Sequence, residues 1–233
     1  MALFLPYSSF PSSTITVLEN GESFSPTLTP IHPDHGEILE LILAIDLSAS
    51  MADPVNALST LLPSLDQALL QIYKDVRYRV IVFRQDIESM LPLTGDPLEV
   101  RAFLSGLSFQ GDPGSAESIL NVLTESYLQG FWEDSQKRIL LASPSSDDLL
   151  SGSLQDYTEQ MVQGFSLDNI AVDCWAPNLY SYHYLAEETG GMFFPLTLSA
   201  DTVMEEALEV LGSQQVFDFY TTTTPSDGSE HTV

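Results

Sequence analysis

The sequence predicts an α/β fold: a doubly wound, mostly parallel six-stranded sheet with one antiparallel edge strand and helices on both faces. Segments rich in branched apolar residues alternate with segments whose apolar residues recur every three or four positions. This alternation indicates strands followed by packed helices. One pair of predicted strands is joined only by residues 84–86, and so short a connection permits only an antiparallel pair.

The central strand is predicted at Ile38–Asp46 and overlaps the stretch LILAIDLSASM at residues 41–51. A continuous apolar run of strand length is typical of a parallel strand that is buried on both faces, so we expect it in the middle of the sheet. The strand ends in an acid. It therefore delivers polar groups to the carboxyl edge, where ligands bind in open α/β sheets.

Three oxygen-bearing side chains follow one another at this strand end, Asp46, Ser48 and Ser50, in the pattern D-x-S-x-S. Carboxylate and hydroxyl oxygens suit Mg²⁺, Mn²⁺ or Ca²⁺ as ligands. The pattern, with Met51 behind it, resembles the first segment of the metal-ion-dependent adhesion site of von Willebrand factor type A (vWA) domains. The alternative is a strand end whose Asp and Ser cap the next helix.

The next segments fit this resemblance. A helix is predicted to begin at Asp53-Pro54, and Pro63 is expected to kink or split it. Val76–Phe83 and Ile87–Leu93 read as two antiparallel strands, with the second at the edge of the sheet. A parallel sheet with one antiparallel edge strand in this place is what the vWA resemblance implies.

The second segment of the predicted site contains Asp112, which lies between Gly111 and Gly114 and ahead of a helix. An acid held by glycines is able to point its carboxylate back toward the first strand's loop. The resemblance implies a Thr or Asp ligand from this loop, although the fit needs one extra residue in this chain. The alternative is a helix-capping Asp in a turn.

The third segment departs from the family pattern. The strand at Lys137–Ala142 is followed by Ser143-Pro144, where vWA domains usually have Thr-Asp-Gly with an acid that completes the metal site. We expect Ser143 in the place of that acid and therefore a degenerate site, because the affinity for hard cations follows ligand count and charge. The predicted metal ligands, for weakly bound Mg²⁺ or another divalent cation, are Asp46, Ser48, Ser50, Asp112 and Ser143.

The remaining segments complete the alternation. Helices are expected at about 154–165, 181–189 and 201–211, with strands at 169–175 and 192–195. The run LAEETGGMFFPL resembles the closing helix, double glycine and last strand of vWA domains. Tyr180, Tyr182 and Tyr184 are interpreted as packing residues at a helix start, with a partner-binding surface as the alternative. The predicted organisation is an N-terminal extension of residues 1–37, a vWA-like domain of residues 38–212 and a flexible tail of residues 213–233.

The N-terminal extension is rich in Pro, Ser and Thr, a composition that excludes long helices. Asn20-Gly21 lies between two extended runs and predicts a β-hairpin. His32 and His35 flank Asp34, and we interpret them as parts of a solvated loop in preference to a metal site.

Composition excludes several classes of function. The chain of 233 residues carries 33 acidic and 7 basic residues, for a formal net charge of -26. This charge repels phosphate backbones and anionic lipids, which argues against nucleic-acid and membrane-surface binding. Cys174 is the only cysteine, and we expect a buried, inert thiol. No signal-peptide pattern and no apolar run of membrane-spanning length is present, so a cytoplasmic protein is expected.

The resemblance implies a non-catalytic protein-interaction module that docks a protein partner at the top of its sheet. One alternative is a metal-dependent phosphatase-like enzyme or another doubly wound hydrolase with Asp46 as phosphoryl acceptor, and another is a structural subunit with a vestigial site. Haloacid-dehalogenase-like phosphatases use D-x-D-x-T, whereas this chain has Ser48 at the second position. Motifs for dinucleotide binding or an α/β-hydrolase nucleophile are absent. We therefore expect no enzymatic activity.

Overall fold

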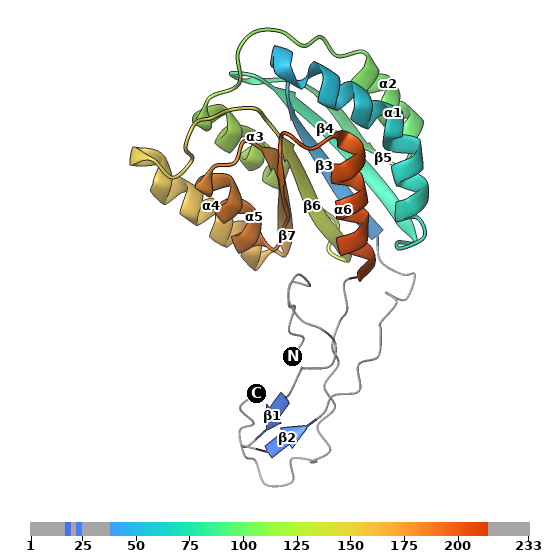
Figure 1. Cartoon of the computed structure of the whole chain (residues 1–233), viewed down its shortest axis with the longest axis vertical. Helices are drawn as coiled ribbons and strands as arrows, with labels where there is room; N and C mark the ends of the chain where they lie inside the picture. Colours follow the sequence, from blue (N-terminus) through green and yellow to red (C-terminus); the bar gives the residue numbers. More distant parts are fainter. Residues whose placement is uncertain (1–16, 20–21, 25–37, 214–233) are drawn as a thin grey trace.

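The computed structural model describes residues 17–19, 22–24 and 38–213 (Figure 1). The elements are, in chain order, β1 (Val17–Glu19), β2 (Glu22–Phe24), β3 (Ile38–Asp46), η2 (Ala49–Met51), α1 (Ala52–Leu69), β4 (Asp75–Phe83), β5 (Ile87–Thr94), α2 (Pro97–Ser105), α3 (Ala116–Leu128), β6 (Ser135–Ala142), η3 (Gly152–Leu154), α4 (Gln155–Leu167), β7 (Ile170–Ala176), α5 (Tyr180–Thr189), β8 (Phe193–Pro195) and α6 (Ala200–Ser213).

The main sheet has six strands in the order β5-β4-β3-β6-β7-β8. Every neighbouring pair is parallel except β4 and β5, which are antiparallel. β3 lies inside the sheet and pairs with β4 along its whole length, from Ile38 opposite Asp75 to Asp46 opposite Phe83. The predicted fold class is therefore confirmed, with the apolar strand inside the sheet and the antiparallel strand at its edge.

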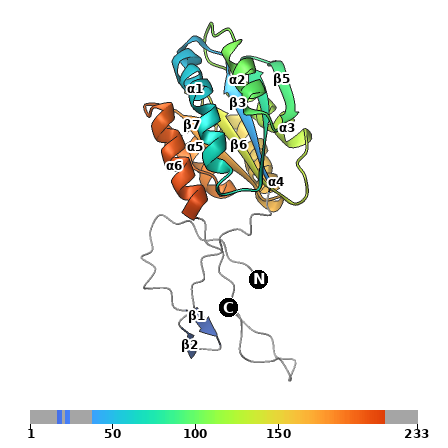
Figure 2. The ribbon, with the colours of Figure 1, turned by 90° about the vertical axis from the view of Figure 1, so that its right-hand side faces the viewer.

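Helices cover both faces of this sheet (Figure 2). One core lies between the sheet and helices α1, α2 and α6, and it takes Leu41, Leu43 and Ile45 from β3. The other lies beneath α3, α4 and α5, and it takes Ile42 and Ala44. Because side chains alternate along a strand, Asp46 belongs to the face that carries α3, α4 and α5.

Helix α1 runs from Ala52 to Leu69 with Pro63 inside it. Of the two outcomes expected from the sequence, a kink or a split at the proline, the split does not occur. Pro63 removes one backbone hydrogen bond. The buried residues of the helix lie on both sides of this position, among them Leu58, Leu62 and Leu65. Burial of a leucine side chain stabilises by about 1.5–3 kcal/mol, and several such side chains offset the cost of about 3 kcal/mol for an internal proline.

Strands β1 and β2 pair antiparallel, with Val17 opposite Phe24 and Glu19 opposite Glu22. The turn predicted at Asn20-Gly21 and the histidines His32 and His35 lie outside the described residues, as does the tail beyond Ser213. Among the helices that the structure describes, none combines the length and apolar character needed to cross a membrane.

Candidate functional site

Asp46 is the last residue of β3, and its side chain is fully buried. Oδ1 accepts a hydrogen bond from the Ser48 amide at 2.8 Å. Oδ2 accepts two, from the Gly114 amide at 2.9 Å and from the Ser143 hydroxyl at 2.9 Å. One carboxylate therefore connects the turn after β3, the loop before α3 and the loop after β6.

Sheet pairing explains why Ser143 reaches Asp46. β3 and β6 are parallel neighbours, with Ile45 opposite Ala142, so their carboxyl ends lie side by side and the next residue of each chain segment meets the other. The Ser143 hydroxyl both donates to Asp46 and accepts from the Ser145 amide at 3.2 Å. The structure places Ser143 beside Asp46, where it serves as a hydrogen-bond donor to that carboxylate.

Gly114 brings its backbone close to β4. A Cβ atom at this position would lie 2.5 Å from the carbonyl oxygen of Arg84 and 3.1 Å from the ring of Phe83. Only glycine fits so close an approach, and the approach delivers the Gly114 amide to Asp46. Sequence analysis identified this glycine as a residue that holds Asp112, whereas the structure shows its own N–H in the site.

The other predicted ligands occupy different environments. Ser48 is fully buried, and its Oγ has no hydrogen-bond partner among the described residues. Ser50 and Asp112 are exposed. The loop of Asp112 lies against the turn after β3, because the Ala49 amide donates to the Gly111 carbonyl at 3.2 Å. Participation of Ser50 and Asp112 in a metal site remains a prediction.

Two contacts at this edge of the sheet were not predicted from the sequence. Ser115, rather than Asp112, caps α3 and accepts from the Ser118 amide. Asp147 accepts from the Ala116 amide at 3.2 Å, so the carboxylate lies at the positive end of the helix. No local spacing in the sequence indicates a cap supplied from a distant loop.

The residues fit a divalent cation in part. An ionised carboxylate offers about four lone-pair positions, and Asp46 uses three of them for hydrogen bonds within the chain. One position on Oδ1 and the unpartnered Ser48 Oγ remain as oxygen ligands. In the described ranges, no group of three or more His, Cys, Asp or Glu side chains is arranged to hold a metal. This arrangement suits a weak site with few anionic ligands.

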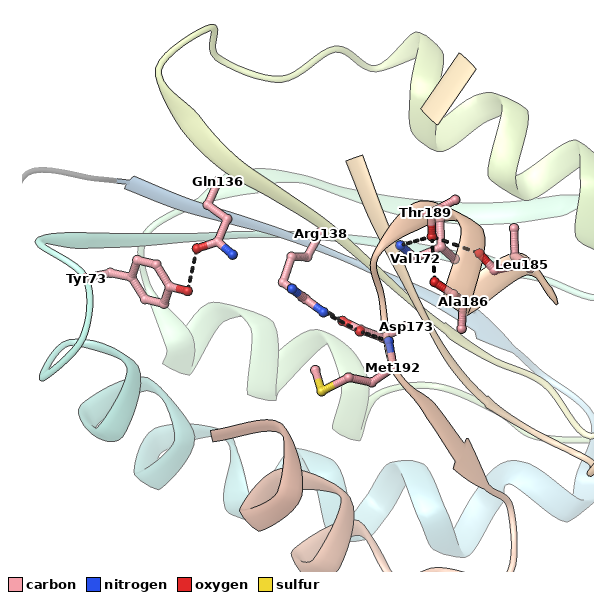
Figure 3. A network of polar contacts seen from close by, with 9 residues as sticks. All are labelled: Tyr73, Gln136, Arg138, Val172, Asp173, Leu185, Ala186, Thr189 and Met192. Carbon is pink, nitrogen blue, oxygen red and sulfur yellow. Dashed lines mark hydrogen bonds and ion pairs between the residues drawn. The ribbon is translucent and has the colours of Figure 1, made fainter. Parts of the chain in front are cut away.

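A second polar cluster lies on the opposite face of the sheet (Figure 3). Arg138 of β6 and Asp173 of β7 form a buried ion pair, in which Nε of Arg138 donates to Oδ2 of Asp173 at 2.9 Å. Oδ1 of Asp173 also accepts from the Met192 amide at 2.8 Å. Burial alone would lower the pKa of Arg138, but the charge and hydrogen bonds of Asp173 raise it. The sequence signal was Arg138, next to Lys137 in β6, and Asp173, the one charged residue of β7.

The ion pair borders a cavity of about 60 Å³ that lies between the sheet and α6 and is lined mainly by leucines and other apolar side chains. On the other face, Cys174 is fully buried and burial raises the pKa of its thiol. This agrees with the inert, buried cysteine expected from the sequence.

The sequence matches no protein-family model and no curated protein. Solved structures do match. The conserved hypothetical protein BatB from Bacteroides thetaiotaomicron has a TM-score of 0.57 and 13% identity, covering 76% of this chain and 98% of that one. An aerotolerance-related membrane protein from Bacteroides fragilis has a TM-score of 0.55 and 14% identity, with coverages of 74% and 98%.

The VWA domain of SpRpn10 matches with a TM-score of 0.56 and 12% identity, over 73% of this chain and 96% of that one. The six-stranded sheet, its antiparallel edge strand and the helices on both faces agree with these structures. At such low identities the likeness concerns the fold, and the chain folds into a von Willebrand factor type A-like domain.

Proposed function

We propose that this chain is a non-catalytic protein-interaction module whose protein partner docks at the carboxyl edge of the sheet, above Asp46. The observation that carries the proposal is the buried Asp46 carboxylate, which joins three chain segments through three hydrogen bonds. These bonds hold the turn after β3, the loop before α3 and the loop after β6 in one arrangement. A surface that is already ordered loses less conformational entropy on binding.

Exposed side chains on these loops would form the contact surface, among them Ser50, Asp112 and Asp148. A divalent cation, when bound through Asp46, Ser48, Ser50 and Asp112 beside Ser143, supplies an open coordination position for an oxygen of the partner. Because three of the Asp46 lone-pair positions are already used, we propose that the cation binds weakly and that docking relies mainly on the loops.

The environment of Asp46 also supports the non-catalytic part of the proposal. A phosphoryl-accepting aspartate needs a carboxylate oxygen that a substrate is able to reach. The Asp46 side chain is fully buried, and both of its oxygens accept hydrogen bonds. A substrate would have to reach this buried carboxylate, on which a single lone-pair position, at Oδ1, is not already used.

The test is site-specific photocrosslinking of the full chain in extract from its source cell. A photoreactive residue replaces Ser50 at the proposed surface or, as a control, the exposed Leu128 at the far end of α3. We expect a discrete protein adduct from position 50 that the charge reversal Asp112→Lys weakens. An adduct that forms equally from position 128 would contradict docking at this edge.

A parallel assay addresses catalysis. The purified chain is incubated with p-nitrophenyl phosphate and Mg²⁺, and we expect no turnover above buffer. Hydrolysis that Asp46→Asn abolishes would overturn the non-catalytic assignment.

A further inference from the structure

A groove with a volume of about 240 Å³ separates helices α4 and α5 on the outer surface of the domain. Glu159, Val162 and Gln163 line it from α4, and Tyr184 and Glu188 line it from α5. Residues spaced by three or four positions share one face of a helix, so each helix presents a single stripe to the groove. The groove is thus formed by two helices, and it does not include the carboxyl edge of the sheet at Asp46.

The groove combines apolar and aromatic surface. Val162 is buried and forms part of its floor, whereas Leu167 is 74% exposed and forms part of its wall. The ring of Tyr184 is half-buried and packs at 6.3 Å, between ring centroids, from the exposed ring of Tyr180. These side chains offer a partly dehydrated aromatic face at the surface of the domain.

The charges of the groove are all negative. Glu159 and Glu188 line the same groove as Tyr184. Burial raises the pKa of the Tyr184 phenol, and the negative charges of these two side chains raise it further. Glu159 accepts a hydrogen bond from the neutral side chain of Gln155 at 2.8 Å. All 7 lysine and arginine residues lie in the described part of the chain, and none lines the groove.

We propose that this groove docks a basic segment of a protein partner, which places an arginine or lysine side chain between Glu159 and Glu188 and over the ring of Tyr184. A cation gains from an aromatic face and from carboxylates at once. Arginine suits the site best, because its guanidinium is planar and weakly hydrated and stacks on aromatic rings. Leu167, which also lines the groove, contacts an apolar residue that flanks the cation. This surface is separate from the edge assigned above to partner docking.

The chain's net charge of -26 attracts any basic peptide. The experiment must therefore distinguish binding in the groove from attraction by the chain's overall negative charge. The probe is a fluorescent, end-blocked peptide with one arginine between leucines, titrated with the full chain at physiological ionic strength. Glu159→Gln with Glu188→Gln removes the charges of the groove. Asp156→Asn with Glu187→Gln is the matched control, because it removes two charges from the same helices at positions that do not line the groove.

We expect the groove variant to bind the peptide at least about tenfold more weakly than the unaltered chain, which corresponds to ~1.4 kcal/mol. The control variant should change the affinity less than twofold. A peptide with citrulline in place of arginine should bind neither form. Equal losses in the two variants would show that only the net charge is sensed, and unchanged affinity in both would place the peptide elsewhere; either result overturns the proposal.

A second pair of variants tests the groove by adding a positive charge and leaves all acidic residues in place. Gln163→Lys places a cation in the groove, and Gln160→Lys places one at an exposed position of α4 outside it. We expect Gln163→Lys to abolish peptide binding and Gln160→Lys to leave most of it. Tyr184→Phe should bind as the unaltered chain does, whereas Tyr184→Leu should bind several-fold more weakly. Thermal melts verify that each variant is folded, and equal binding by the two lysine variants would refute the proposal.

Discussion

The hydroxyl of Ser143 donates a hydrogen bond of 2.9 Å to Oδ2 of Asp46, across a sequence separation of 97 residues. The resemblance to vWA domains predicts an acid at the place of Ser143, and two carboxylates at such a distance repel each other unless a cation lies between them. Serine supplies a proton where an acid would supply a second negative charge. The Asp46 carboxylate thus accepts its hydrogen bonds from donors of the chain itself.

Restoring the acid should make the fold dependent on metal. We expect Ser143→Asp to destabilise the chain in EDTA by about 2–4 kcal/mol, because a donor to Asp46 is lost and a like charge is added. Millimolar Mg²⁺ should recover much of this loss, since ligand binding to the native state stabilises by RT ln(1 + [L]/Kd). Urea denaturation with and without Mg²⁺ measures both effects. Ser143→Ala is the control and should lose about 1–2 kcal/mol with no recovery in Mg²⁺.

The unaltered chain should respond weakly to Mg²⁺. With few anionic ligands available, we expect a stabilisation of no more than about 1 kcal/mol in 1 mM Mg²⁺, and Asp46→Ala should remove it. Thermal melts at matched ionic strength in NaCl control for screening, because the chain repels itself at its net charge of -26. A large shift that persists in Asp46→Ala would place the cation elsewhere.

Gly114→Ala tests the loop that supplies the second donor. The new Cβ would lie 2.5 Å from the Arg84 carbonyl oxygen, so the loop must move and withdraw its amide from Asp46. We expect a loss of about 2–4 kcal/mol in the free energy of unfolding. Gly164→Ala in α4 is the matched control, because its Cβ meets nothing within 4 Å, and it should stabilise by up to ~1 kcal/mol. Equal effects of the two substitutions would mean that the contact at Gly114 is not tight.

Removing one partner of the ion pair between Arg138 and Asp173 should destabilise the fold more than replacing both partners with apolar residues. Asp173→Asn leaves a buried guanidinium without its counter-charge and should cost about 3–5 kcal/mol. The double variant Arg138→Met, Asp173→Leu removes both charges and leaves the Met192 amide without its acceptor, for about 1–3 kcal/mol. Urea denaturation of both variants measures the difference. A double variant less stable than Asp173→Asn would contradict this view.

Glu40 gives the stability a dependence on pH. Burial raises the pKa of its carboxyl above 4.5, although the Trp132 amide and nearby Arg77 and Arg79 oppose the shift. The folded state therefore retains a proton that the unfolded state has lost, and this group's contribution to stability falls as the pH rises above 4.5. Glu40→Gln should remove that fall. Denaturation between neutral pH and pH 4.5 checks it, since the unaltered chain should gain stability relative to Glu40→Gln on acidification; parallel curves would contradict the prediction.

The sequence predicted that β3 lies inside the sheet and β5 at its edge, because two periodicities distinguish strands from helices. Side chains alternate in the strands and recur every three or four residues in the helices. β3 was recognisable by its unbroken apolar run, and β5 by the short connection at residues 84–86. The sheet followed from these patterns and from the limits on strand connections.

The contacts within the site were less predictable, because several come from the backbone or from distant loops. The Gly114 amide reaches Asp46 through a loop conformation that no side chain specifies. Asp147 caps α3 from a position 31 residues beyond Ala116. Continuity of α1 through Pro63 depends on packing against the sheet, which local propensity does not include.

The sequence separation between Asp46 and Ser143 also determines when, during translation, this hydrogen bond is able to form. A ribosome adds about 5–20 residues per second, so roughly 5–20 s pass between the synthesis of Asp46 and that of its most distant donor. Once Thr94 has been added, the nascent chain contains β3, β4 and β5, but until residues 135–142 follow it lacks β6 and therefore one side of the central strand. The acid that joins the three loops in the finished protein stays incompletely paired until translation has passed the middle of the domain.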